Sequence, residues 1–234
     1  MRFPNAAKGV KRIFTAELIK LFGSLCGIAG IVIIAIGVVE TVLSSEIKVN
    51  DAKALVEAII ADAFGTFLGG LILIVAWVVL SIVAFVLHLV GIINAKNDEI
   101  SFKSALTCLI IELIAPVIAG IFVNVNSVVS SLFYTFAHLM GLFVTLFIIS
   151  GCIKLADKLN RGDVSAKGSN VLKLIFVIAA LSLVLNVVST VMMTGTAVFV
   201  TAMILFAAAL VLIVIQYIMF LSFLSKAKKM LAES

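Results

Sequence analysis

The chain has 234 residues, 64% of them hydrophobic and 12% charged, with a mean hydropathy of +1.34. Soluble domains are about 45–50% apolar and about 25% charged, so this composition excludes an ordinary soluble fold and indicates a protein of the cell membrane. The net charge of +5 is divided among short segments beside apolar runs. This distribution argues against a nucleic-acid partner and makes the lipid bilayer the expected partner.

The first element in chain order is the N-terminal segment 5–20. Val10 and Ile13 fall on one helical face, and Lys8, Lys11 and Arg12 fall mostly on the opposite face. This pattern predicts an interfacial helix that lies beneath anionic lipid headgroups. A docking site for a partner protein is the alternative interpretation of the same pattern.

Six apolar runs follow, and each is long enough to cross a hydrocarbon core of about 30 Å at about 1.5 Å per residue. They do not alternate as the strands of a membrane barrel would. The sequence therefore predicts an all-α fold, a polytopic helix bundle in a single membrane-embedded domain over residues 1–234. The predicted spans are residues 21–42, 64–94, 104–123, 128–153, 174–192 and 197–224.

The longest outer loop lies between the first two spans. Within residues 51–63 apolar side chains recur at i, i+3 and i+4, which predicts an amphipathic helix on the outer surface. Two interpretations of its apolar face remain open, contact with lipid and a lid over an outward-facing cavity. Of the 17 Lys and Arg residues, only Lys48 and Lys53 fall on this side of the membrane. The positive-inside rule then places both termini in the cytoplasm.

Four residues within the spans are candidates for a ligand or proton site. Glu112 stands in an apolar run, and Pro116 removes the hydrogen-bond donor that the carbonyl of Glu112 would otherwise meet. A carboxylate inside a span costs several kcal/mol and faces the bundle interior with a partner. His88, on the neighbouring antiparallel span, is the expected partner of Glu112, and His138 in the fourth span is a further candidate. In the alternative interpretation, Glu112 has a purely structural role and holds neighbouring helices together through a hydrogen bond.

Other polar and small residues predict contacts between helices. Asn186 and Gln216 are expected to form hydrogen bonds between spans rather than to bind a ligand. Small residues at a spacing of four let helix backbones approach closely, within the bundle or across a homo-oligomer. These pairs are Gly23 with Gly27, Gly65 with Gly69, and Ala137 with Gly141.

No catalytic, nucleotide-binding or metal-binding motif occurs in the sequence, so we expect neither an enzyme nor a cofactor. The three cysteines fall in apolar runs and predict reduced thiols. Two function classes remain open. One is a non-catalytic membrane interaction or scaffold protein, which is the safer conclusion from the sequence. The other is a small transporter or solute-binding membrane subunit that uses Glu112 with His88 or His138.

The predicted orientation can be tested by cysteine labelling in a variant that lacks Cys26, Cys108 and Cys152. A cysteine at Lys53 should react with a membrane-impermeant thiol reagent applied outside intact cells, whereas a cysteine at Lys158 should not. Labelling at Lys158 from outside would rule out cytoplasmic termini with six crossings.

Overall fold

The computed structural model describes residues 2–44, 64–191 and 196–234, and within these ranges every regular element is an α-helix. All six described helices are long and apolar enough to cross a membrane, so the predicted all-α bundle is confirmed. The outer amphipathic helix predicted at 51–63 lies outside the described residues. The helices are α1 (Pro4–Ser44), α3 (Phe64–Ala95), α4 (Ile100–Phe122), α5 (Ser127–Lys158), α6 (Gly162–Val191) and α7 (Thr196–Glu233).

The main difference from the prediction is at the N-terminus. Residues 5–20 are helical as expected, but no break separates them from the first span, and α1 runs continuously from Pro4 to Ser44. Proline is favourable in the first turn of a helix, and no proline follows within α1 to interrupt it. At roughly 60 Å, α1 is about twice as long as the hydrocarbon core is thick. The apolar face that we expected to lie on lipid is instead buried at Val10 and Ile13.

The chain forms two compact units, which we describe separately. One consists of residues 15–88, and the other combines residues 1–14 with residues 89–234. Both α1 and α3 contribute to each unit, because the division falls within these two helices. We call the first the hairpin unit and the second the main unit.

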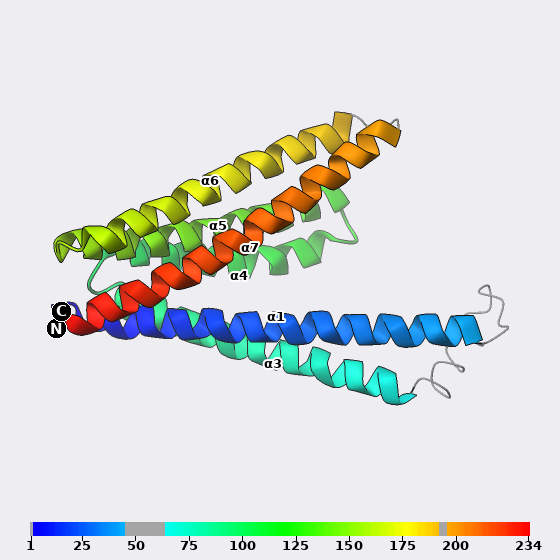
Figure 1. Cartoon of the computed structure of the whole chain (residues 1–234), viewed down its shortest axis with the longest axis horizontal. Coiled ribbons are helices and arrows are strands. Elements are labelled where there is room, and N and C mark those ends of the chain that lie inside the picture. The colour runs from blue at the N-terminus through cyan, green and yellow to red at the C-terminus, as the bar shows by residue number, and fades with distance from the viewer. Residues whose placement is uncertain (1, 45–63, 192–195) are drawn as a thin grey trace. The chain divides into compact units, whose positions relative to one another are not determined.

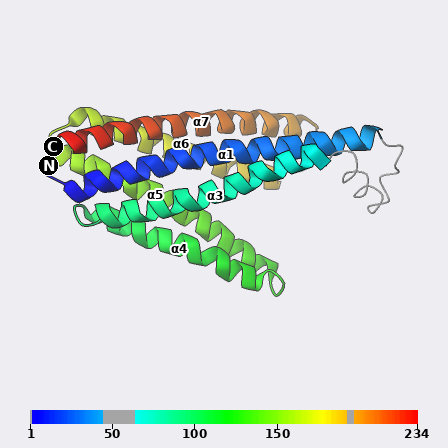
Figure 2. The same ribbon diagram turned by 90° about the horizontal axis from the view of Figure 1, so that it is seen from below.

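In the hairpin unit, α1 and α3 lie side by side and run antiparallel (Figures 1 and 2). A methyl group added at Gly30 would lie 2.8 Å from the carbonyl oxygen of Gly70, so the two backbones are in contact there. Gly27 packs against the Trp77 ring, as the predicted role of Gly23 and Gly27 requires. Gly65 and Gly69 have no other described residue within 4 Å of an added Cβ. Gly70 therefore makes the close backbone contact with α1. Gly65 and Gly69 make no such contact with the described residues of this chain, and their packing across a homo-oligomer stays a prediction.

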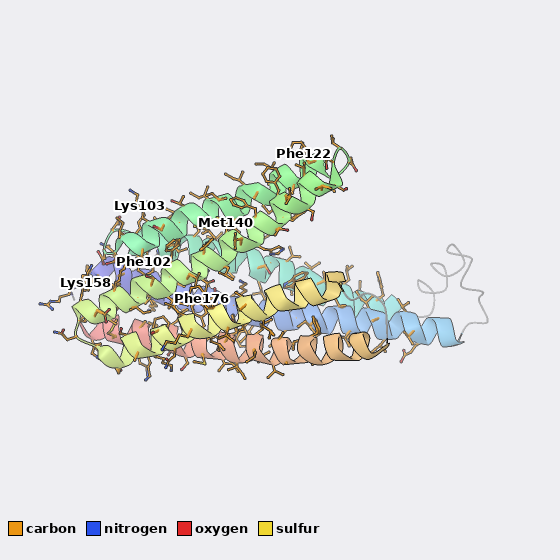
Figure 3. All side chains as sticks on the ribbon, turned by 90° about the horizontal axis from the view of Figure 1, so that it is seen from above. Phe102, Lys103, Phe122, Met140, Lys158 and Phe176 are labelled. Atoms are coloured by element: carbon orange, nitrogen blue, oxygen red, sulfur yellow. The ribbon has the colours of Figure 1, made fainter. Side chains whose placement is uncertain are left out.

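In the main unit, α4 and α5 form a tight antiparallel hairpin, α6 packs on α5, and α7 packs on α6. The turn between α4 and α5 is short because Asn126 caps α5, its side chain accepting from the backbone N–H groups of Val128 and Val129. At the same end the Phe122 and Phe133 rings stack with centroids 6.3 Å apart. Figure 3 shows Phe122 at this turn and Lys158 at the opposite end of the hairpin.

A polar network closes the opposite end of the main unit. Glu99 is buried, and its carboxylate accepts a hydrogen bond from Lys158 at 2.6 Å. Lys154 lies 3.9 Å from the same carboxylate and donates to the Ser101 hydroxyl at 3.0 Å. Because a buried carboxylate needs a partner, these lysines hold the end of α5 against the start of α4.

The two ends of the chain meet beside this network. The backbone N–H of Arg2 donates to the carbonyl of Ser234 at 3.2 Å, and the ammonium group of Lys228 lies 4.3 Å from the centroid of the Phe14 ring. Termini on the same side are what an even number of crossings requires.

The close contact at Gly70 predicts a large difference between two adjacent glycines. Gly70→Ala places its Cβ 2.9 Å from the carbonyl oxygen of Gly30 and should lower the free energy of unfolding in detergent by about 1–3 kcal/mol, as overpacking does. Gly69→Ala meets open space and should be neutral or stabilising by up to about 1 kcal/mol. Thermal unfolding followed by circular dichroism compares the two, and equal effects would contradict the packing described for this unit.

Candidate functional site

The carboxylate of Glu112 lies between α4 and α5, directly against Gly141. A Cβ added at Gly141 would be 2.6 Å from Oε1 of Glu112 and 3.0 Å from its carboxyl carbon. Ala137, one turn earlier on α5, is buried in the same hairpin. The small residue at 141 therefore makes room for a carboxylate as well as for a neighbouring helix. This is a more specific role than the sequence pattern predicted.

Pro116 lies within α4, one turn beyond Glu112, and the helix continues through it to Phe122. Because proline has no backbone N–H, the carbonyl of Glu112 loses its usual partner in the helix. The predicted coincidence of an ionisable side chain with a freed carbonyl is therefore present in α4. Such groups are tolerated in a membrane where protein or water satisfies them.

His88 has a partner within its own unit that the sequence did not predict, and the predicted pairing of His88 with Glu112, which belongs to the main unit, stays a prediction. In the hairpin unit, Nδ1 of His88 lies 3.3 Å from Oε1 of Glu17, which is itself buried. Nε2 of His88 is buried and has no hydrogen-bond partner in the part of the chain that the structure describes. Glu17 was not among the predicted site residues, because residues 5–20 were expected to form an interfacial helix on lipid. Its spacing from Val10 and Ile13 puts Glu17 on their buried face and could have identified it.

The remaining sequence candidates have separate outcomes. His138 is exposed on α5, next to the buried Ala137, and therefore faces away from the α4–α5 contact. The side chain of Asn186 lies outside the described residues. Across the described ranges, no group of three or more His, Cys, Asp or Glu side chains could hold a metal ion. Cys26, Cys108 and Cys152 are free thiols.

A cavity of about 410 Å³ opens among α5, α6 and α7 in the main unit. Most of its lining is aliphatic, and two side chains, Thr145 and Gln216, are polar. Gly141 also lines it, so the residue that accommodates Glu112 borders the cavity as well. The cavity could not be predicted from the sequence, because residues of three helices form it and no short motif marks them. The full lining is Gly141, Leu142, Thr145, Ile175, Ile178, Ala179 and Gln216.

Gln216 is the polar group of the cavity with the most hydrogen-bonding capacity left over. It is half-buried, and its amide makes no hydrogen bond to any described residue, so the predicted helix–helix hydrogen bond is not formed there. The Thr145 hydroxyl donates to the carbonyl of Gly141 only at 3.4 Å. An amide carries two donors and one acceptor, and leaving them unsatisfied in apolar surroundings is costly. The cavity can therefore offer hydrogen bonds to a molecule that enters it.

The volume and lining of the cavity are those of a small-molecule site. Such sites measure about 300–1,000 Å³ and combine mostly apolar walls with a few polar groups that fix orientation. No protein-family model matches the chain, and no significant match was found among the curated proteins or among the solved structures. Six helices are long and apolar enough to cross a membrane, so the chain is a multi-pass helical membrane protein. The cavity is the feature of the main unit that bears most directly on its role.

The contact between Glu112 and Gly141 predicts energetic coupling between the two residues. Gly141→Ala should lower stability in detergent by about 1 kcal/mol or more, because its Cβ displaces the carboxylate, and should cost nothing in a Glu112→Ala background. Gly120→Ala on α4, where an added Cβ meets no described residue within 4 Å, is the matched control. A double-mutant cycle by thermal unfolding measures the coupling. Additive effects of the two substitutions would show that the carboxylate does not occupy this position.

Proposed function

We propose that this protein is a non-catalytic membrane-embedded binding protein whose site is the cavity among α5, α6 and α7. The expected ligand is small and mostly apolar, with one group that exchanges hydrogen bonds with Gln216. This proposal corresponds to the solute-binding alternative of the two function classes. The proposal claims only that a ligand binds. Transport would additionally require access to the cavity from both sides of the membrane.

The observation that carries the proposal is the Gln216 amide, which has no hydrogen-bond partner among the described residues. A glutamine whose only role is to hold membrane helices together forms a hydrogen bond with a neighbouring helix. Gln216 instead borders a cavity large enough for a small molecule. Water or a ligand group in that cavity would satisfy the amide, and apolar walls around a single polar group favour a molecule with an alkyl or aromatic body.

Glu112 has a secondary part in this proposal. Glu112 is not among the residues that line the cavity, but its carboxylate lies against Gly141, which does line the cavity. We infer that Glu112 sets the position of α5 against α4 and thereby fixes one wall. Substitution of Glu112 by Gln should therefore leave the site intact, because the amide keeps most of the shape and hydrogen bonding of the acid.

A photoreactive probe tests the proposal. The probe is a straight-chain alkyl amide that carries a diazirine, applied to the protein in lipid nanodiscs, and labelled residues are mapped by mass spectrometry. We expect labels to concentrate on Leu142, Thr145 and Ile178, because these residues line the cavity. Excess unlabelled alkyl amide should compete the labelling away.

Two neighbouring alanines provide matched variants. Ala179→Trp should fill the cavity and reduce the competed labelling at least tenfold, whereas Ala180→Trp, at a position that is not among the lining residues, should leave the labelling unchanged. Labels spread evenly over lipid-facing residues such as Val117, with no effect of Ala179→Trp, would reject the binding site. The interaction or scaffold class would then account better for the bundle.

A further inference from the structure

A polar stripe, which consists of Ser131, Thr135 and His138, runs along α5 from the α4–α5 turn toward the cavity. All three side chains are exposed and, at spacings of four and three residues, they share one face of the helix. The same spacing continues to Leu142 and Thr145, which line the cavity. The polar stripe and the cavity therefore belong to one face of α5, and the stripe ends one turn before the cavity lining begins.

This face differs from the one that packs on α4. Ser130 is buried and donates to the carbonyl of Ala119 on α4 at 3.0 Å, and the buried Ala137, seven residues further along, shares its face. Ser131 and His138 each follow one of these buried residues by one position, which turns them about 100° around the helix. The polar stripe consequently points away from α4.

Polar side chains at such positions are unfavourable against hydrocarbon. Hydroxyl and imidazole groups within a membrane span are found where protein or water meets them. Leu132 and Leu139 each lie one position beyond the stripe, and these exposed apolar side chains suit lipid. Helix α5 thus separates an apolar face from a polar face that leads to the cavity.

Toward the termini, tightly packed apolar side chains close the cavity. An added Cβ at Gly168 on α6 would lie 2.6 Å from Cγ1 of Ile153 on α5 and 2.8 Å from the Phe223 ring on α7, so the three helices are in mutual contact there. Ile149 and Phe220, which lie between this contact and the cavity residues of their helices, are buried as well. A molecule that enters from the end where the termini lie would have to displace this packing.

We propose that the polar stripe lines a water-filled entry path, through which a ligand reaches the cavity from the side of the membrane opposite the termini. This inference rests on the proposed binding function, because it assigns a route to the same site. His138 is the stripe residue next to the cavity and is the first side chain that directs the polar group of an entering ligand. An imidazole can both donate and accept a hydrogen bond, as the Gln216 amide can, so path and cavity suit the same class of ligand.

Cysteine accessibility tests the entry path in the full chain, with the three native cysteines replaced by alanine and the protein sealed in proteoliposomes. A cysteine at each position of the polar stripe should react with a small membrane-impermeant methanethiosulfonate reagent added on the side opposite the termini. Cysteines at Leu132 and Leu139 are controls at matched heights on α5. They should react at least about tenfold more slowly, because a thiol in apolar surroundings forms little of the reactive thiolate. A protease site at the C-terminus reports the orientation of the protein.

Reagent on the side of the termini should modify the polar stripe at least about tenfold more slowly than reagent on the opposite side, because the packed side chains intervene. Equal reaction at the stripe and at the two leucine positions would overturn the entry path, and so would faster reaction from the side of the termini.

The alkyl amide separates failure of the path from failure of the binding function. If the stripe reacts as expected but the alkyl amide does not slow modification of a cysteine at Thr145, the path stands and the binding function fails. If the amide competes photolabelling of the cavity while the stripe is unreactive, the binding function stands and the path is wrong.

Discussion

A lipid bilayer provides no hydrophobic force that draws one apolar helix onto another, so helices in it associate where their surfaces fit closely. In this protein the fit depends on positions without a side chain. Gly30 and Gly70 bring α1 and α3 into backbone contact in the hairpin unit, and Gly9 with Gly91 does the same in the main unit. The third such place is Gly141, where the missing side chain leaves room for a carboxylate. Each contact fixes the register of a helix pair and so decides which other residues come together.

Register explains how the polar groups are distributed. With α1 held against α3, Asp98 reaches the first turn of α1, and Glu17 lies within 3.3 Å of His88. With α5 held against α4, the lysines near its end reach Glu99. Gln216 is different, because its amide forms no hydrogen bond with a described residue. Nε2 of His88 also lacks a partner among the described residues, but it is buried, whereas Gln216 borders a cavity large enough for a small molecule. We therefore assign a binding role to the cavity and a structural role to the ion pairs.

The helices themselves could be predicted from the sequence, because their long apolar runs cannot be accommodated in water. Their ends could not be predicted as well. The apolar run of the first span begins near Leu21, but α1 begins at Pro4, since the amphipathic first turns are buried on protein. The importance of Glu112 and Pro116 could be seen from their unusual setting. The partner of His88 and the cavity depend on which faces of different helices meet, and a single sequence does not determine that for spans that are apolar on every side.

The most direct test of the binding role is an experimental structure of the full chain in a lipid nanodisc, at a resolution that shows side chains. Our account predicts elongated non-protein density in the cavity bordered by Thr145 and Gln216, with its polar end within hydrogen-bonding distance of the Gln216 amide. A cavity that has closed, with Gln216 hydrogen-bonded to a neighbouring helix, would contradict it.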